Sequence, residues 1–340
     1  MINEKEVEKI GKFWDRSVEK NRKSDKVIRF LKMLASEKRL PVKGWLRSVI
    51  RSHGGDATGW WHNPLVVRKI NARICGREVD GRSAGIIEWL KNSYGDLFPL
   101  EKGISVGCGD GSKEIRFIRA GIVRNFDLYE FSEKSIESGR LLARRLGLAE
   151  VMNFRLGNAL EEIKTPASYD FVVWNDALHH MPDVSEALAW SRKILKPGGI
   201  FAIDDFVGAT RYQWSDRSLA LARVVRETLP LRYRAVPGSP FRYPSAKIER
   251  PTVAYMIEKD PSEAADSDRI LPSLTEHFPE AVVRKTGGII YHLALHELMH
   301  NFSPERDKPL LELLMLIDEH CIPTSGTNYA AAIGQKTKGQ

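Results

Sequence analysis

The most informative stretch of the chain is residues 103–115, which read Gly-Ile-Ser-Val-Gly-Cys-Gly-Asp-Gly-Ser-Lys-Glu-Ile. The apolar run that ends at Gly107 predicts a buried strand, and the segment after Gly111 predicts a helix. Gly107, Gly109 and Gly111 allow a tight turn in which bare backbone approaches a ligand at the start of that helix. The loop lacks the G-K-[ST] ending of a triphosphate-binding loop, and Ser112 stands where a dinucleotide fingerprint has Gly or Ala. The spacing therefore disfavours a ligand held by its phosphates.

Short apolar runs alternate with helical segments from residue 102 onward, which is typical of βαβ units and a parallel sheet. Strands are expected at 103–107, 125–130, 151–156, 170–175 and 199–205, followed by 280–286 and 328–335. Upstream, helical periodicity without strand alternation predicts helices at 3–22, 25–36, 42–52, 64–75 and 83–93. Downstream, helices are expected at 133–146, 211–229, 289–302 and 308–320, with a loop or lid at 230–251.

Composition and charge place the chain among ordinary globular proteins. Of 340 residues, 42% are apolar and 28% charged, which argues against disordered and fibrous classes. Residues 1–51 hold 15 Lys or Arg and 7 Asp or Glu, so their excess equals the net charge of +8 of the whole chain. Apolar residues recur there at helical spacing, which indicates an amphipathic helix with a solvated face, although a basic segment can also attract nucleic acid or acidic molecules.

The sequence predicts neither a signal peptide nor a membrane span, and it predicts no disulfide bonds. The first residues are charged, and no run approaches the 18 apolar residues of a membrane span. Cys75, Cys108 and Cys321 lie far apart, so neither a disulfide framework nor a cysteine-rich zinc site is expected. We therefore expect a cytoplasmic protein without a membrane span.

Glu130 ends the second expected strand, about twenty residues after the loop, where a carboxylate can accept hydrogen bonds from both hydroxyls of a ribose. A nucleoside ligand is therefore expected. Together with Glu130, five segments stand in a characteristic order: V-G-C-G-D-G at 106–111, D-L-Y-E at 127–130, G-N-A-L at 157–160, Y-D-F-V-V-W-N-D-A-L-H-H at 169–180 and L-K-P-G-G-I-F at 195–201. Through them the chain resembles the class I S-adenosylmethionine-dependent methyltransferases.

The resemblance implies an α/β fold with a Rossmann-like, mostly parallel seven-stranded sheet of order 3-2-1-4-5-7-6. It also implies a helical N-terminal cap at residues 1–84. The methyltransferase domain would then cover 85–340, with lid insertions at about 206–279 and 287–327.

S-adenosylmethionine is the cofactor that the resemblance implies. The residues carried over to its site are Gly107, Cys108, Gly109 and Gly111 around the methionine and ribose, Glu130 on the ribose, Asn158 and Ala159 facing adenine, and Asn175. The family often has Asp at position 158, so an adenine contact would here rely on the amide oxygen of Asn158.

Catalytic and substrate residues are expected after the fourth and fifth strands, because ligands of open α/β sheets lie outside the carboxyl ends of the strands. The candidates for acceptor chemistry are Asp176, His179 and His180, and each histidine is either a base or a structural residue. Trp60 and Trp61 in a Gly-containing loop, Asp205 and Tyr243 are the candidate substrate residues. No metal ligand is assigned to this site.

The acceptor is expected to be a small molecule. The N-P-P-Y or D-P-P-Y pattern, by which methyltransferases grip the amine of a base, is absent after the fourth strand, where Asn175-Asp176-Ala177-Leu178 stands. Nucleic acid is therefore disfavoured. Further segments resemble a bacterial subgroup connected with small-molecule or glycan tailoring: D-F-V-G-A-T-R-Y-Q-W at 205–214, D-P-S-E-A at 260–264, T-G-G at 286–288 and N-F at 301–302.

These patterns favour O-methylation of a sugar or natural-product hydroxyl, with an acidic acceptor and a homodimer left open. An RNA or protein methyltransferase, or an inactive donor-binding scaffold, are the alternatives within the same fold.

A competing motif lies near the C-terminus. His296-Glu297-Leu298-Met299-His300 matches H-E-x-x-H, which on an α-helix places two imidazoles on one face to bind zinc, with the glutamate as a base. The alternative is an amphipathic helix whose apolar residues are packed. The first reading would make the protein a zinc metallopeptidase.

Overall fold

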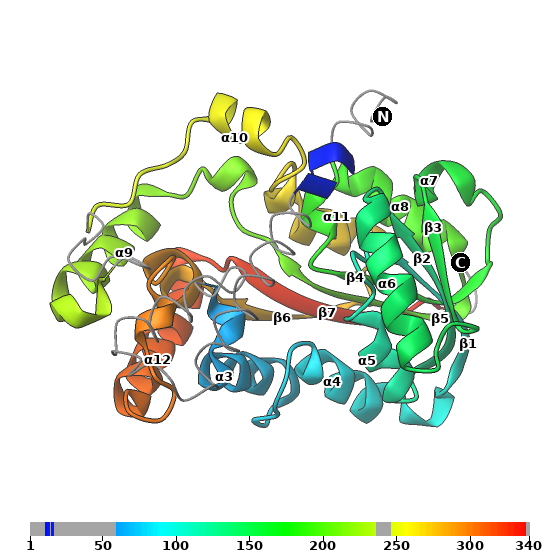
Figure 1. The fold of residues 1–340 in the computed structure, drawn as a ribbon, viewed down its shortest axis with the longest axis horizontal. Coiled ribbons are helices and arrows are strands. Elements are labelled where there is room, and N and C mark those ends of the chain that lie inside the picture. Colours follow the sequence, from blue (N-terminus) through cyan, green and yellow to red (C-terminus); the bar gives the residue numbers. More distant parts are fainter. Residues whose placement is uncertain (1–10, 14, 17–58, 236–245, 338–340) are drawn as a thin grey trace, which may run out of the picture.

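A computed structural model describes residues 11–13, 15, 16, 59–235 and 246–337. Its centre is a sheet of seven strands: β1 (Leu100–Val106), β2 (Val123–Glu130), β3 (Met152–Leu156), β4 (Tyr169–Asn175), β5 (Leu195–Phe206), β6 (Val282–Gly287) and β7 (Tyr329–Gln335). The order is β3-β2-β1-β4-β5-β7-β6, and β7 runs antiparallel to both of its neighbours while β1 to β5 are parallel. The predicted strands and their order are confirmed (Figure 1).

Helices cover both faces of the sheet, and Figure 1 shows α3, α4 and α5 on one side and α8 and α11 on the other. The helices are α3 (Pro64–Cys75), α4 (Ala84–Tyr94), α5 (Glu114–Arg119), α6 (Glu133–Arg145), α7 (Ala159–Glu162), α8 (Val184–Ile194), α9 (Asp216–Thr228), α10 (Val253–Lys259), α11 (Ile270–His277) and α12 (Lys308–Ser325). Because strand side chains alternate between faces, Phe171 joins the core beneath α3 to α6, whereas Trp174 joins the core beneath α8 and α11.

The expected helix at 289–302 is wrong as a regular α-helix. Residues Ile289–Ala294 form a π-helix, a turn follows, and Met299–Asn301 form a single 3₁₀ turn. Glu297 has a left-handed φ of 61°, which interrupts any continuous α-helix. The expected helix at 211–229 begins later, at Asp216, because Arg211 and Tyr212 also have left-handed φ values.

A buried ion pair fixes the start of the π-helix. Arg73 of α3 donates to Asp318 of α12 at 2.7 Å, and the two side chains are 7% and 0% exposed. Asp318 also accepts from the backbone N–H groups of Gly288 and Ile290. Since Gly287 and Gly288 carry φ values of 88° and 113°, the chain turns here in a way that favours glycine. The pair therefore anchors the segment that carries residues 291–296.

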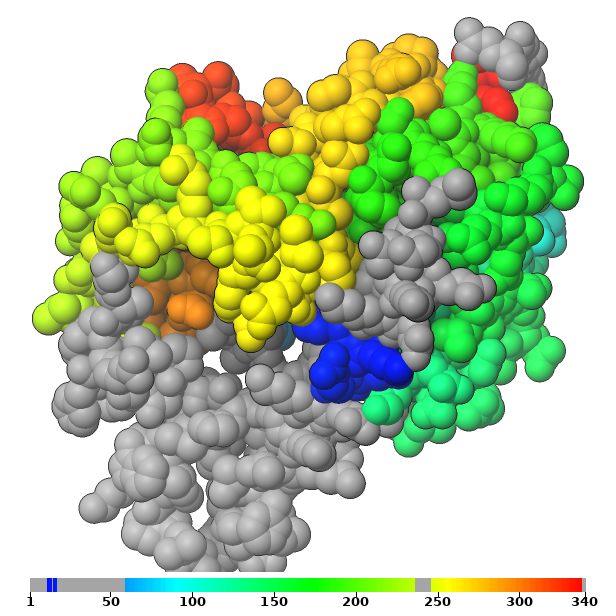
Figure 2. Space-filling view, turned by 90° about the horizontal axis from the view of Figure 1, so that it is seen from above, coloured from blue at the N-terminus to red at the C-terminus, as the bar shows by residue number. Residues whose placement is uncertain are grey.

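Little of the N-terminal region is described. The expected helices at 25–36 and 42–52, most of the one at 3–22, and Tyr243 lie outside the described residues. Residues 11–13, 15 and 16 pack against the start of α6, where Asp15 accepts hydrogen bonds from the Ser132 hydroxyl and the Lys134 N–H (Figure 2). None of the helices in the described part of the chain has the length and apolar character of a membrane-crossing helix.

Candidate functional site

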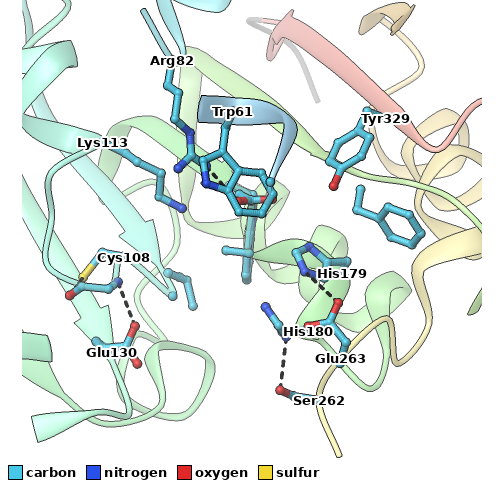
Figure 3. Close-up of a pocket in the computed structure, with 18 of the residues that line it drawn as sticks. Trp61, Arg82, Cys108, Lys113, Glu130, His179, His180, Ser262, Glu263 and Tyr329 are labelled. Atoms are coloured by element: carbon cyan, nitrogen blue, oxygen red, sulfur yellow. Dashed lines mark hydrogen bonds and ion pairs between the residues drawn. The ribbon is translucent and has the colours of Figure 1, made fainter. Parts of the chain in front are cut away.

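A cavity of about 620 Å³ opens at the carboxyl ends of β1, β2 and β4. Two groups of side chains face each other across it, one around Glu130 and the glycine loop, the other around His179, His180 and Glu263 (Figure 3). We call the first group the loop end of the cavity and the second the histidine end. The cavity is therefore continuous from the predicted nucleoside site to the predicted acceptor residues.

The loop end is built by three glycines in left-handed conformations. Gly107, Gly109 and Gly111 have φ values of 66°, 59° and 70°, which L-residues with side chains rarely adopt. A Cβ at Gly111 would lie 2.8 Å from Phe154, whereas nothing lies within 4 Å of a Cβ built at Gly109. Gly111 therefore serves packing, and Gly109 leaves open space beside bare backbone.

Cys108 lines the same loop but is only 2% exposed. Burial, with the nearby carboxylates of Glu114 and Glu130, raises the pKa of its thiol well above the ordinary value. A thiol in this state is a poor nucleophile, so Cys108 contributes shape and backbone rather than reactivity.

Glu130 holds the loop and the start of α6 together. One carboxylate oxygen accepts from the Gly109 N–H at 2.8 Å, and the other accepts from the N–H groups of Phe131 and Ser132 at 2.7 and 3.0 Å. Each carboxylate oxygen has two lone pairs, so three of the four acceptor positions are taken. The oxygen that accepts from Gly109 keeps one position for a ribose hydroxyl. Glu130 lines the cavity, as the spacing from the loop predicts.

Four residues expected near the cofactor do not reach the cavity wall, and the packed Gly111 is one of them. Asn158 caps α7 by accepting from the Leu160 N–H, and Ala159 is fully buried in the core. The Asn175 side chain donates to the Ser83 hydroxyl at 3.0 Å inside the protein. Gly157, which directly precedes Asn158 and Ala159, lines the cavity instead of them.

The histidine end begins with a buried carboxylate. Asp205 is fully buried, and it accepts from the N–H groups of Ala177 and Leu178 at 2.9 and 2.7 Å. Its other oxygen lies 2.5 Å from Nδ1 of His179. Asp205 therefore lies behind His179, away from the cavity, and it orients the imidazole rather than contacting a substrate.

A loop from the insertion supplies the other side of this group. Glu263 Oε1 lies 3.8 Å from Nε2 of His179, and the Tyr212 hydroxyl donates to the same oxygen. The loop is held in place by Arg211, which donates to the backbone carbonyls of Pro261 and Glu263 at 2.7 and 2.9 Å. The Ala265 N–H also donates to the carbonyl of His179 at 3.0 Å.

Buried charges shift several pKa values at this end. Burial alone would lower the pKa of His179, but the attraction of Asp205 and Glu263 outweighs it and raises the pKa to about 9. Burial and the neighbouring carboxylates of Asp176 and Asp205 raise the pKa of Asp204 to about 7. The region is therefore rich in carboxylates and favours positive charge.

Asp176 and two basic residues lie between the two ends. Asp176 pairs with Arg82 at 3.3 Å, and Lys113 donates to the backbone carbonyl of Asn175. Burial opposes the ionised form of Asp176, but Lys113, His179 and Arg82 outweigh it and lower its pKa. Asp176 lines the cavity as an ionised side chain, together with both basic residues.

Aromatic side chains form the wall on the remaining side. Trp60 makes edge contacts with Tyr291 and Tyr329 at ring-centroid distances of 5.4 Å, and Trp61 lies next to it. Phe206 and Tyr212 continue this wall toward the histidine end. We refer to Trp60, Trp61, Phe206, Tyr212, Tyr291 and Tyr329 as the aromatic wall.

The H-E-x-x-H motif does not form a zinc site in this structure. His296 lines the cavity, but the break in helix geometry between Ala294 and Met299 removes the helical spacing that would aim both imidazoles at one ion. Within the part of the chain that the structure describes, neither His296 nor His300 belongs to a group of side chains close enough to hold a metal. The metallopeptidase interpretation therefore loses its structural basis.

Several residues of the site were not predicted from the sequence. Glu263, Tyr212, Tyr291, Tyr329, Arg82 and Lys113 were given no role. The segments that carry Tyr212 and Glu263 were noticed, D-F-V-G-A-T-R-Y-Q-W and D-P-S-E-A, and they are the two that meet at the histidine end.

The sheet order, the positive-φ glycine loop and its carboxylate partner define a nucleoside-binding domain of the Rossmann-like type. Residues 99–241 match the family model described as a methyltransferase domain. The chain is 31% identical over 121 residues to the 27-O-demethylrifamycin SV methyltransferase of Amycolatopsis mediterranei, an alignment of 35% of this chain and 44% of that protein. It is 29% identical over 114 residues to the ubiquinone biosynthesis O-methyltransferase of Leptothrix cholodnii, with 33% and 47% aligned. The chain thus spans less than half the length of each of these relatives.

Solved structures with a similar fold include the geranyl diphosphate C-methyltransferase of Streptomyces coelicolor A3(2), with a TM-score of 0.46, 13% identity, and 75% of this chain and 76% of that chain covered. Phosphoethanolamine N-methyltransferase 2 of Haemonchus contortus gives a TM-score of 0.46 and 13% identity, with 73% and 51% covered. Residues 99–241 thus match a methyltransferase domain, and S-adenosylmethionine is the cofactor that the sequence resemblance to the class I enzymes implies. The open space at Gly109 beside the Glu130 carboxylate fits the ribose of this cofactor.

Proposed function

We propose that the protein transfers the methyl group of S-adenosylmethionine to a hydroxyl oxygen of a small molecule. The observation that carries this proposal is the single cavity that joins the loop end to the histidine end. Its volume of about 620 Å³ lies within the range of roughly 300–1,000 Å³ that is common for small-molecule sites.

The loop end would hold the donor. Glu130 would accept a hydrogen bond from a ribose hydroxyl, while the backbone at Gly107 and Gly109 would lie against the methionine part. The bound sulfonium supplies the methyl group. What the protein adds is mainly the position of the acceptor behind that group and the exclusion of water.

The histidine end would activate the acceptor. As the acceptor oxygen forms its new C–O bond, the C–S bond of the donor breaks with its electron pair on sulfur, and the hydroxyl proton must leave. His179, His180 and Asp176 line the cavity at this point, and the ionised Asp176 carboxylate would take that proton. Asp205 fixes the orientation of the His179 ring, and Glu263 faces the same space.

The aromatic wall supports an acceptor with an apolar or ring-shaped body. Aromatic faces and edges bind flat rings and the apolar face of a sugar, and they favour neither nucleic acid phosphates nor a charged peptide. A natural-product hydroxyl therefore fits the wall better than a strongly acidic sugar. Arg82 could pair with one anionic group on the acceptor, although the Asp176 carboxylate already offsets the charge of its guanidinium.

The alternative function is that of an RNA or protein methyltransferase. The excess of basic residues at 1–51 is the feature that supports it. Salt-sensitive binding of RNA to the full-length protein would favour that alternative, because phosphate contacts release counterions. The small-molecule proposal predicts that added RNA neither binds at physiological salt nor alters turnover.

Glu130→Ala should weaken the binding of S-adenosylhomocysteine by about 10- to 150-fold, which corresponds to about 1.5–3 kcal/mol for hydrogen bonds to a charged group. The reason is the loss of the carboxylate that accepts from the ribose and also holds the Gly109 N–H. Isothermal titration calorimetry measures this directly.

Glu133→Ala is the matched control, because Glu133 is an exposed carboxylate three residues further on that does not line the cavity. It should bind S-adenosylhomocysteine like the wild type. Undiminished binding by a folded Glu130→Ala protein would contradict the assigned role. A screen of hydroxylated aromatic, polyketide-like and sugar acceptors, followed through S-adenosylhomocysteine release, would then identify the acceptor class.

A further inference from the structure

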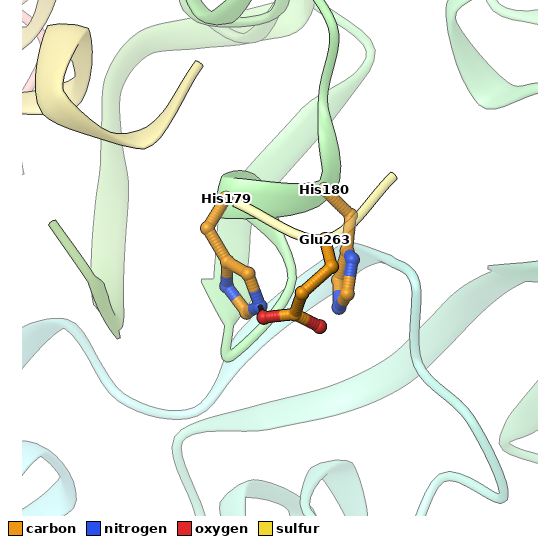
Figure 4. Close-up of side chains that lie close together, drawn as sticks. All are labelled: His179, His180 and Glu263. Atoms are coloured by element: carbon orange, nitrogen blue, oxygen red, sulfur yellow. Dashed lines mark ion pairs between the residues drawn. The ribbon is translucent and has the colours of Figure 1, made fainter. Parts of the chain in front are cut away.

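His179, His180 and Glu263 form a compact group at the histidine end of the cavity. One ligand-type atom from each of the three lies within 4.8 Å of the other two. The two imidazole rings lie 4.0 Å apart at their centroids, and Figure 4 shows both with a nitrogen turned toward the Glu263 carboxylate. His179 Nε2 and Glu263 Oε1 are 3.8 Å apart, which is longer than a hydrogen bond. The three side chains thus converge on one point without a direct hydrogen bond between that pair.

Each imidazole is oriented through its Nδ1 atom. Nδ1 of His179 is bonded to the buried Asp205 carboxylate at 2.5 Å. Nδ1 of His180 lies 3.2 Å from the Ser262 hydroxyl, and that hydroxyl donates to Asp260 at 2.6 Å. Since the Ser262 proton goes to Asp260, the Ser262 oxygen accepts from Nδ1–H of His180. Each ring is therefore oriented through Nδ1, so Nε2 is the atom that would bind a metal ion.

Glu263 is oriented as firmly as the two histidines. The Tyr212 hydroxyl donates to its Oε1 atom, and Arg211 holds the backbone of its loop. Histidines that bind metals almost always donate their second N–H to a carboxylate, a carbonyl or water, which fixes the tautomer and the ring. His179 has such a partner in Asp205, and His180 has a serine hydroxyl that itself donates to Asp260, so each imidazole is held by a supporting hydrogen bond.

We infer that His179, His180 and Glu263 bind a divalent transition-metal ion, with Zn²⁺ as the best fit, at the acceptor end of the cavity. This inference rests on the proposed function and names how that site would recognise its acceptor. Two imidazole nitrogens and one carboxylate oxygen are the ligand set of catalytic zinc sites that keep a further position open. Nitrogen-rich sets suit Zn²⁺ and related ions better than Mg²⁺ or Ca²⁺, which prefer oxygen ligands.

The surrounding charge supports a cation at this point. Asp205 and Glu263 together carry two negative charges on either side of His179, and they offset the charge of a divalent ion. The ion would take the place of the proton that these carboxylates otherwise favour on that ring. All three ligands line the cavity, so the open coordination position would face the acceptor.

Such an ion would select acceptors whose reactive hydroxyl is a good oxygen ligand, above all those with a second oxygen beside it. A hydroxyl bound to a divalent cation would ionise more readily, with its proton passing to the Asp176 carboxylate or to solvent. The ionised oxygen would then attack the methyl group as the C–S bond of the donor breaks with its electron pair on sulfur. The acceptor class is therefore a vicinal diol, a hydroxyketone or a comparable pair of oxygens on an apolar body.

The test measures metal binding directly on the full-length protein without any acceptor. Protein stripped with a chelator should bind one Zn²⁺ per chain in calorimetry, and Co²⁺ should give the visible absorption bands of a nitrogen- and oxygen-ligated site. Glu263→Gln and His180→Gln should each weaken Zn²⁺ binding by at least about 100-fold, a loss at the upper end of that caused by removing a supporting partner.

His296→Gln is the matched control, because His296 lines the same cavity but lies outside this group. It should bind Zn²⁺ like the wild type. S-adenosylhomocysteine binding and thermal unfolding are recorded for every variant, so that a failed metal site is distinguished from a failed donor site. Absence of stoichiometric Zn²⁺ in the reloaded wild type, or unchanged affinity in Glu263→Gln, would overturn the inference while leaving the donor site intact.

Discussion

Arg73→Met should lower the free energy of unfolding by about 3–5 kcal/mol, because it removes one partner of a buried ion pair and leaves the other charge uncompensated. Asp318, the remaining partner, is fully buried and would keep only its backbone donors at Gly288 and Ile290. Arg73 also donates to the carbonyls of Thr286 and Met315, and both would lose this partner. Urea unfolding followed by circular dichroism measures the effect.

Lys69→Met is the matched control on the same helix. Lys69 pairs with Glu78 at 2.6 Å, but the two side chains are 30% and 46% exposed. An exposed pair of this kind contributes about 0–1 kcal/mol, so this variant should unfold almost like the wild type. Equal losses in both variants would show that the Arg73–Asp318 pair is no anchor. The pair matters for the site because it fixes the segment that carries Tyr291 and His292 into the cavity wall.

Gly109→Leu should reduce S-adenosylhomocysteine affinity by at least about 100-fold, or about 2.7 kcal/mol. The position has a left-handed φ of 59°, and nothing lies within 4 Å of an added Cβ. The side chain would therefore project into the open space beside Glu130, where the donor is expected to lie. Calorimetry with S-adenosylhomocysteine measures the loss.

Gly121→Leu separates this steric effect from backbone strain. Gly121 has a left-handed φ of 72° and also has nothing within 4 Å of an added Cβ, but it does not line the cavity. Both variants should lose roughly 1–3 kcal/mol of stability from a non-glycine residue in this conformation. Only Gly109→Leu should lose the ligand. If Gly109→Leu bound S-adenosylhomocysteine as tightly as Gly121→Leu does, the donor would not bind at this loop.

The fold could be predicted because its strands carry their own signal. The central strands are buried on both faces, so they appear in the sequence as short apolar runs. The last two strands, β6 and β7, lie near the C-terminus and pair with each other. The prediction of an α-helix at 289–302 was wrong because the apolar residues of this segment have the spacing that is typical of an α-helix. Its actual geometry depends on two glycines with positive φ and on Asp318, which lies 30 and 28 positions after the Gly288 and Ile290 N–H groups that donate to it.

Most of the site residues that could be predicted lie at the end of one strand, and Trp60 and Trp61, predicted from a loop, also line the cavity. Glu130, His179 and His180 follow directly from strands β2 and β4. Asn158 was expected at the adenine, but asparagine readily caps helices, and the local bond to Leu160 N–H takes its side chain. Glu263 reaches His179 from 84 positions later in the chain through a loop held by Arg211, and no local pattern reports such a contact.

The most direct test is a crystal structure of the protein with S-adenosylhomocysteine. We expect a ribose hydroxyl on the Glu130 carboxylate, the methionine part of the ligand against Gly107 and Gly109, and the sulfur turned toward His179 and His180. A ligand bound elsewhere, or a loop end closed by protein side chains with no room for the nucleoside, would contradict the account.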